Sequence, residues 1–244
     1  MKDLLSFFTV FPVRGATLEG AAREIHLLPL IGLITGLPGA VLLLAAHFVP
    51  PGVAATLALG AVLLASGLHH ADGVLDVGDA IMAHGSPDRR REVLQDARVG
   101  IGGLGALFLV YAPTVGALAA LCATSPARAA LALLAGEVAA RSAMLLTLAF
   151  GEPADPHSSS VPFVGALSGP RRTPAVVTAL LAPLPFLLVT SSLLAPLTIL
   201  AVPLVGLGAL PISVARFGGI GGDVVGATGE VSRTALLVFL SATV

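Results

Sequence analysis

Three aspartates, Asp72, Asp76 and Asp79, follow one another at helical spacing just after a long apolar segment. In a helix, positions i, i+4 and i+7 lie within about 60° of one another, so the three carboxylates share one face. Like charges four residues apart destabilise a helix, and aspartate is a poor helix former, so this face needs a counter-charge. We expect a divalent cation, because carboxylate oxygens favour Mg²⁺, Mn²⁺ or Ca²⁺ over zinc. The alternative is a solvated acidic face paired with the basic run Arg89–Arg91.

Residues suited to phosphate chemistry surround these aspartates. His70 and Gly73 flank Asp72, and Arg89 and Arg90 follow within twenty residues. The segment then continues with Asp96, Arg98, Gly100 and Gly103. Glycine lets the backbone approach a phosphate closely, and arginine neutralises phosphate oxygens. The segment therefore predicts transfer of a phosphate-linked group, in which positioning and charge neutralisation do most of the work.

A second glycine-rich segment, residues 216–233, contains Gly219, Gly222 and Asp223. We expect residues 69–100 and 216–233 to be loops on the same side of a membrane, so that the second segment completes the site. A flexible loop with scattered charges is the alternative for this segment.

The composition indicates which class of protein carries these segments. Of 244 residues, 56% are hydrophobic and only 11% are charged, and the mean hydropathy is +0.97. A soluble domain has about 25% charged residues. The formal net charge of −1 gives no reason to expect nucleic-acid binding, and one cysteine excludes a disulfide framework or a cysteine-ligated zinc site. We expect a single all-α transmembrane domain over residues 1–244, a polytopic helical bundle with about six or seven transmembrane helices.

Apolar segments of roughly 20 residues are long enough to cross a bilayer. The candidate spans are Leu28–Val49, Val53–Leu68, Ile101–Ala123, Arg128–Phe150, Pro174–Thr190 and Leu193–Ala215, with a seventh from Thr234 to Val244. Prolines inside the fifth and sixth spans predict kinks. The segment Met1–Val13 is expected to form an interfacial or re-entrant helix rather than a cleaved signal.

The fourth candidate span contains two charged residues, Glu137 and Arg141, four positions apart. An ionisable residue at this depth costs roughly 2.5–3.5 kcal/mol on insertion scales, so we expect the two to pair with each other. A role in lining a substrate cavity is the alternative.

Lysine and arginine lie mostly on one side of these spans. Eleven of the thirteen occur in the N-terminal segment and in residues 69–100, 151–173 and 216–233, whereas the three short intervening loops carry none. By the positive-inside rule, we expect the N-terminus and the charged loops in the cytoplasm, and the protein in the plasma membrane.

These motifs resemble those of the cobalamin synthase (adenosylcobinamide-GDP ribazoletransferase) family. The family pattern H-x-D-G-x-x-D-x-x-D is matched by His70, Asp72, Gly73, Asp76 and Asp79. The pattern R-R-x-E-x-x-x-D-x-R-x-G-x-x-G is matched by Arg89, Arg90, Glu92, Asp96, Arg98, Gly100 and Gly103. The C-terminal pattern G-G-x-T-G-D-x-x-G-A is matched by Gly218, Gly219, Gly222, Asp223, Gly226 and Ala227, with Gly221 where the family usually has Thr. The segments Phe7–Pro12 and Leu28–Gly36 also fit, so the resemblance covers essentially the whole chain.

The resemblance implies that two substrates, adenosylcobinamide-GDP and α-ribazole or its 5′-phosphate, are joined at the membrane. The ribazole 3′-hydroxyl attacks the corrinoid-linked phosphate, and GMP leaves. We expect Mg²⁺ to be held by Asp72, Asp76 and Asp79. Asp223 is expected to hold a second metal ion or to orient the ribazole. Assembly into a homo-oligomer stays open.

The remaining candidate residues are assigned to proton transfer and phosphate binding. Asp96 is expected as a fourth metal ligand or as the base that takes the hydroxyl proton. His70 is expected to contact a phosphate or act as a base, with a structural histidine as the alternative. Arg98, Arg89 and Arg90 are candidates for neutralising phosphate charge. The glycines expected to lie against substrate are Gly73, Gly100, Gly103, Gly219 and Gly222.

Two other functions share some of these features. CDP-alcohol phosphotransferases also place several aspartates at a membrane boundary, in the pattern D-G-x-x-A-R-x₈-G-x₃-D-x₃-D. Asp76 stands where that pattern has alanine, and no arginine follows. A transporter or channel would place ionisable residues near mid-span, which here only Glu137 and Arg141 satisfy.

Overall fold

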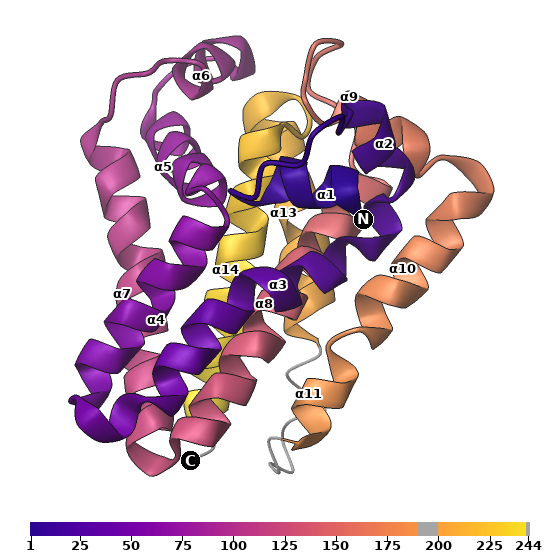
Figure 1. The fold of residues 1–244 in the computed structure, drawn as a ribbon. Coiled ribbons are helices and arrows are strands. Elements are labelled where there is room, and N and C mark those ends of the chain that lie inside the picture. The colour runs from indigo at the N-terminus through magenta and orange to yellow at the C-terminus, as the bar shows by residue number, and fades with distance from the viewer. Residues whose placement is uncertain (190–199, 243–244) are drawn as a thin grey trace.

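The computed structural model describes residues 1–189 and 200–242, and within them the fold is a bundle of helices (Figure 1). The helices are α1 (Lys2–Phe8), α2 (Leu18–Arg23), α3 (Leu28–Leu44), α4 (Pro51–Ala65), α5 (His69–Met82), α6 (Pro87–Leu94), α7 (Ile101–Thr124), α8 (Pro126–Phe150), α9 (Val161–Ala166), α10 (Arg172–Leu181), α11 (Leu184–Val189), α13 (Ala201–Phe217) and α14 (Gly222–Ser241). The described residues contain no β-strand, only an isolated bridge between Pro153 and Ile220. The predicted all-α fold is therefore confirmed.

Four helical segments are long and apolar enough to cross a membrane. They are Ile25–Phe48, which extends α3 by one short turn at each end, and the helices α7, α8 and α14. A fifth span results if α4 and α5 are counted together, although their axes meet at 95°. The described part of the chain thus has fewer full-length spans than the six or seven that we predicted.

The later candidate spans account for most of this difference. The fifth, Pro174–Thr190, is divided into α10 and α11 between Leu181 and Leu184, where Pro183 interrupts the helix. The first residues of the sixth, 193–199, lie outside the described residues, and the remainder is the 17-residue helix α13. The seventh begins at Gly222 rather than Thr234. The prediction that residues 216–233 form a loop is therefore wrong for most of that segment. It is also wrong for most of residues 69–100, which contain α5 and α6.

Helix α8 lies at the centre of the bundle, and most of its residues are buried. Its alanines and glycine allow neighbouring helices to approach closely, and glycines on those neighbours do the same. A Cβ atom on Gly32 of α3 would lie 2.5 Å from the backbone oxygen of Glu137, and one on Gly206 of α13 would lie 2.9 Å from that of Ala143. Small residues therefore set the spacing between the central helix and its neighbours.

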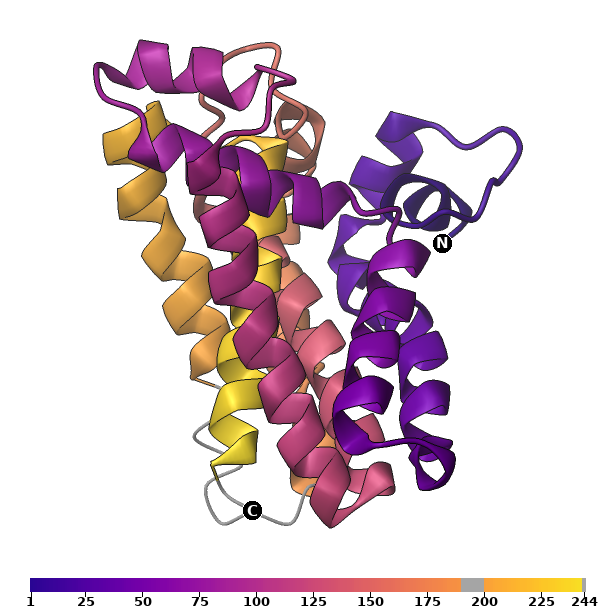
Figure 2. The same cartoon turned by 90° about the vertical axis from the view of Figure 1, so that its left-hand side faces the viewer.

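Helix α5 leaves the direction of α4 and lies across one end of the bundle (Figure 2). The change of direction occurs at Gly67 and Leu68, whose φ angles are +69° and +62°. Leu68 is the only described residue other than glycine with a positive φ, so this turn is a sharply defined feature. Because α5 lies across the ends of the other helices, we treat it as outside the membrane-spanning segments.

The charged segments gather at the same end of the bundle as α5. Helices α1, α2, α6 and α9 and the first turn of α14 all lie there, whereas the α3–α4 and α7–α8 connections lie at the opposite end (Figures 1 and 2). The predicted N-terminal helix is present as α1, and its residue Leu4 is buried against the rest of the bundle. Its location at a membrane interface stays a prediction.

Candidate active site

Four carboxylates from two helices come together where α5 meets α14. Helix α5 carries Asp72, Asp76 and Asp79, as the spacing predicted, and Asp223 lies in the first turn of α14. Burial and three nearby carboxylates raise the pKa of Asp76 from 3.8 to about 6, and those carboxylates are the other members of this group. The structure therefore places the predicted metal ligands of both sequence motifs in one region, although no three such side chains among the described residues lie close enough together to hold a metal ion as they stand.

Glycine makes this meeting of two helices possible. A Cβ atom on Gly73 would lie 2.7 Å from the backbone oxygen of Asp223, closer than side-chain carbons are found to approach. One on Gly226 would lie 3.2 Å from the Cα atom of His70. Gly73 was predicted to lie against substrate, and here it lies against the backbone of α14. Its lack of a side chain places Asp223 beside the α5 aspartates.

Asp79 differs from the other aspartates because its oxygens already accept hydrogen bonds. The backbone N–H groups of Gly100 and Gly103 donate to the Asp79 carboxylate at 2.7 and 2.8 Å, at the N-terminus of α7. A Cβ atom on Gly103 would lie 2.7 Å from the backbone oxygen of Leu75. These two glycines thus join α7 to α5, and a role for Asp79 as a metal ligand stays a prediction.

No positive charge among the described residues pairs with Asp72, Asp76 or Asp223. The basic run has other partners. Arg90 donates to the backbone oxygens of Ala80 and Ile81 at the C-terminus of α5. The alternative of an acidic face paired with this run is therefore wrong.

The other two arginines of the run are also engaged. Arg89 pairs with Glu92 at 2.6 Å on the surface of α6, and Arg91 pairs with Asp88. Arg91 also donates to the backbone oxygen of Phe217 at 2.8 Å, so it joins α6 to the end of α13. The carboxylate cluster is left with excess negative charge. Within residues 1–189 and 200–242, no three His, Cys, Asp or Glu side chains form a ready-made metal site.

Asp96 and Arg98 form an ion pair with each other in the connection before α7. The distance from Arg98 Nη2 to Asp96 Oδ2 is 2.7 Å, and Nε donates to the same carboxylate. These hydrogen bonds lower the pKa of Asp96 to about 2, which makes it a weak base at neutral pH. The structure therefore holds these two predicted catalytic residues in a pair of their own.

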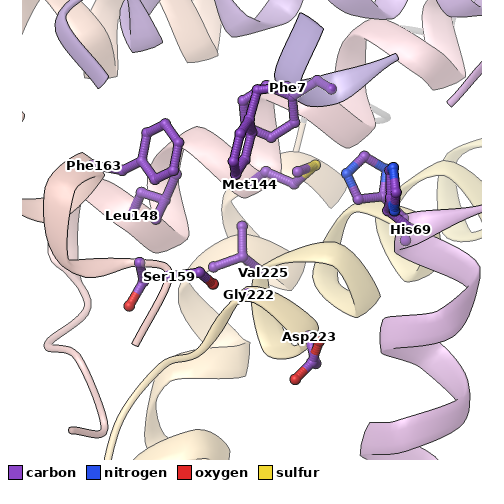
Figure 3. A pocket seen from close by; sticks show the side chains of 12 residues that line it. Phe7, His69, Met144, Leu148, Ser159, Phe163, Gly222, Asp223 and Val225 are labelled. Atoms are coloured by element: carbon purple, nitrogen blue, oxygen red, sulfur yellow. The ribbon is translucent and has the colours of Figure 1, made fainter. Parts of the chain in front are cut away.

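A cavity of about 280 Å³ adjoins the carboxylate cluster (Figure 3). Gly222, Asp223 and His70 all line it. The rest of the wall consists of Phe7, Phe8, His69, Met144, Leu148, Ser159, Ser160, Phe163 and Val225. A second cavity, of about 210 Å³, is more polar and shares Gly222 and Asp223 with the first.

Several of these wall residues were not predicted from the sequence as site residues. Phe7 and Phe8 belong to α1, and Ser159 and Phe163 belong to the segment around α9, far from both motifs in sequence. The only sequence signal was the match of Phe7–Pro12 to the family pattern. Gly219, a predicted substrate contact, lies instead against the 152–154 backbone, where a Cβ atom would be 2.6 Å from the Glu152 oxygen.

Fold and site together define a polytopic helical membrane protein whose clustered carboxylates and cavity meet at one end of the bundle. Comparison with known families identifies which such protein this is: residues 1–241 match the family model for cobalamin-5-phosphate synthase, so the chain belongs to that family. The family resemblance seen in the motifs is therefore confirmed.

Curated relatives match over nearly their whole length and carry the name adenosylcobinamide-GDP ribazoletransferase. The chain is 30% identical to the protein of Methanosarcina barkeri, over 98% of this chain and 90% of the relative. It is 35% identical to that of Azorhizobium caulinodans, over 96% and 92%, and 32% identical to that of Thermococcus kodakarensis, over 99% and 97%. No solved structure matches the chain. The family decides against the CDP-alcohol phosphotransferase and transporter alternatives.

Proposed function

We propose that this protein is a Mg²⁺-dependent adenosylcobinamide-GDP ribazoletransferase. One structural observation carries the metal dependence: Asp72, Asp76 and Asp223 converge from two helices with no cationic partner among the described residues. Carboxylate oxygens are the ligands that Mg²⁺ prefers, and the pKa of Asp76 is raised by its burial and by the negative charge of the neighbouring carboxylates. When bound, Mg²⁺ would supply charge neutralisation for the diphosphate of the activated corrinoid.

The reaction replaces the phosphoanhydride bond of the diphosphate by a phosphate ester bond. The 3′-hydroxyl oxygen of α-ribazole, or of its 5′-phosphate, forms a bond to the corrinoid-linked phosphorus. The bond from this phosphorus to the oxygen of GMP breaks, and GMP carries away the electron pair. The hydroxyl proton passes to a base. Asp96 remains a prediction for that base, and Arg98 would have to release its carboxylate first.

The residues of the chain position the reactants. Asp72 and Asp76 on α5 and Asp223 on α14 would hold the metal ion. Asp79 fixes the angle of α5 against α7 through Gly100 and Gly103. Residues of α1 and of the segment around α9 line the adjoining cavity and would limit the access of water to the part of a substrate bound there.

The experiment is turnover by the purified protein in lipid nanodiscs. Adenosylcobinamide-GDP and α-ribazole 5′-phosphate are supplied after treatment with EDTA, and GMP release is followed before and after Mg²⁺ is restored. The proposal expects release only with Mg²⁺, together with a cobalamin 5′-phosphate product. Absence of GMP release from a folded sample in Mg²⁺ would contradict it.

We further propose that the protein lies in the plasma membrane with its site on the cytoplasmic side, because the basic segments lie at that end of the bundle. A cysteine placed at His84, which is exposed near α6, should react with a membrane-impermeant maleimide only in inside-out vesicles. A cysteine at Gly52, at the opposite end, should show the reverse. The native Cys122 is buried and gives little background.

A further inference from the structure

The cavity beside Asp223 has a wall made largely of aromatic rings. The ring centroids of Phe7 and Phe8 are 4.9 Å apart, and Phe163 lies 5.2 Å from the first and 5.9 Å from the second. Met144 and Leu148 of α8 also line the cavity (Figure 3). Three elements far apart in the sequence thus supply one apolar surface, formed by α1, α8 and α9. Such a surface suits a flat, weakly polar ring.

One polar group in this wall has no partner. The His70 side chain is 7% exposed, lines the cavity and makes no hydrogen bond within the described residues, and its Nδ1 atom is fully buried. A buried ring nitrogen without a partner is costly, so most are satisfied by protein, water or ligand. Since Nδ1 has no surface open to the cavity, a bound ring would have to receive its hydrogen bond from Nε2, which makes no hydrogen bond within the described residues.

We propose that this cavity binds the benzimidazole base of α-ribazole, with His70 donating a hydrogen bond to the unsubstituted ring nitrogen of that base. The inference rests on the proposed function and extends it to the binding site of one substrate. A benzimidazole is flat and bicyclic, and it has one free acceptor nitrogen. The flat ring of the base can therefore stack on the three phenylalanines, and its one acceptor nitrogen can receive a hydrogen bond from the unpartnered imidazole of His70.

The other ring systems in the reaction fit less well. Guanine carries several donors and acceptors along one edge, and the three phenylalanines, Met144 and Leu148 would leave those that face them unsatisfied, while the Ser160 hydroxyl already donates to the Ile220 oxygen. The corrin ring is far larger than a cavity of about 280 Å³. Gly222 and Asp223 line both this cavity and the more polar one beside it, so a base in the first would have room for its ribose next to them. The attacking 3′-hydroxyl would then emerge at the carboxylate cluster.

Direct binding tests the assignment without any need for turnover. Binding of α-ribazole to the protein in nanodiscs is measured by equilibrium dialysis, for the wild type, Phe7→Leu and Phe163→Leu. Loss of stacking should weaken binding roughly five- to tenfold. The matched control is Phe108→Leu on α7, whose ring is 70% exposed and away from the cavity, and it should bind as the wild type does.

An analogue tests the role of His70. In the indole form of α-ribazole, a carbon replaces the free ring nitrogen, so the hydrogen bond cannot form. The wild type should prefer α-ribazole over the analogue by about tenfold, and His70→Leu should bind the two within about twofold of each other. Because the imidazole has no protein partner, its replacement leaves no other group unpaired.

The outcomes separate this inference from the proposed function. Unchanged ribazole binding in both phenylalanine variants, or a preference that survives in His70→Leu, would overturn the inference. The inference would also be overturned if the phenylalanine variants raised the KM for adenosylcobinamide-GDP and left the KM for α-ribazole unchanged, since the cavity would then hold the guanine end of the other substrate. If the wild type binds α-ribazole in the expected pattern but releases no GMP with Mg²⁺, the cavity assignment stands and the proposed function fails.

Discussion

Arg233 of α14 donates a hydrogen bond to Glu137 of α8 at 2.8 Å, and both side chains are fully buried in the bundle. Arg141 lies 3.4 Å from the same glutamate, as the sequence predicted, and Glu230 pairs with Arg233. Two acids and two bases thus form a neutral group between the two helices. Thr35 connects α3 to it, donating to Glu137 at 2.8 Å. This group fixes α14, and therefore Asp223, relative to the centre of the bundle.

Removing the shared acid should be strongly destabilising. Glu137→Gln leaves two buried arginines facing a single remaining carboxylate, and loss of one partner of a buried pair costs about 3–5 kcal/mol. Thermal unfolding in detergent measures the effect as a lower Tm. Glu92→Gln, which breaks the exposed pair with Arg89, is the matched control and should leave Tm nearly unchanged. Equal Tm values for the two variants would show that the buried group is not what holds α8 to α14.

A side chain at Gly73 should separate the two halves of the site. In Gly73→Ala, the new Cβ atom would lie 2.7 Å from the Asp223 backbone oxygen, so α5 and α14 must move apart. We expect GMP release to fall at least tenfold. Gly105→Ala on α7 is the control, because nothing lies within 4 Å of its Cβ position, and its activity should be retained. Wild-type turnover in Gly73→Ala would mean that the close crossing of the helices is not required.

Asp79 should stabilise the start of α7 whether or not a metal ion is present. Asp79→Ala removes the acceptor for the N–H groups of Gly100 and Gly103, and each unsatisfied group costs about 1–3 kcal/mol. Hydrogen exchange in EDTA should therefore become faster over residues 100–104. If protection in EDTA is the same as in the wild type, Asp79 does not cap this helix.

The raised pKa of Asp76 predicts how stability changes with pH in metal-free buffer. The folded pKa is about 6, against an ordinary value of 3.8, so between these values the folded state binds more protons than the unfolded state. The free energy of unfolding should therefore fall as pH rises from about 4 to 6 and level off above. In Asp76→Asn this contribution should vanish, whereas the exposed Asp88→Asn should keep it. An identical pH dependence in Asp76→Asn and the wild type would contradict the burial of this carboxylate among others.

The sequence was most informative where local spacing decides the structure. The aspartates at 72, 76 and 79 lie on one helix because their spacing already matched its period. The Glu137–Arg141 pair followed from the cost of leaving either charge alone at that depth. The interfacial character assigned to Met1–Val13 predicted a helix there, and α1 is that helix.

Contacts between distant segments could not be predicted in the same way. Glycines at 226 and 229 favoured a loop, yet they lie inside α14, where His70 and Met144 occupy the space that side chains would fill. Arg233 was counted among the basic residues of the predicted cytoplasmic loops, but Glu137 and Glu230 neutralise it in the interior. The wall residue Phe163 had no local signal, because its partners Phe7 and Phe8 are more than 150 residues away.

The central claim is that α5 and α14 together form a Mg²⁺ site for the transferase reaction, and Asp76→Asn tests it most directly. Initial rates of GMP release are measured in nanodiscs over a Mg²⁺ titration, for the wild type, Asp76→Asn and the control Asp88→Asn. We predict that Asp76→Asn needs at least tenfold more Mg²⁺ for half-maximal activity or loses turnover, while Asp88→Asn follows the wild-type curve. A wild-type rate and Mg²⁺ dependence in Asp76→Asn would contradict the assignment of this carboxylate cluster as the metal site.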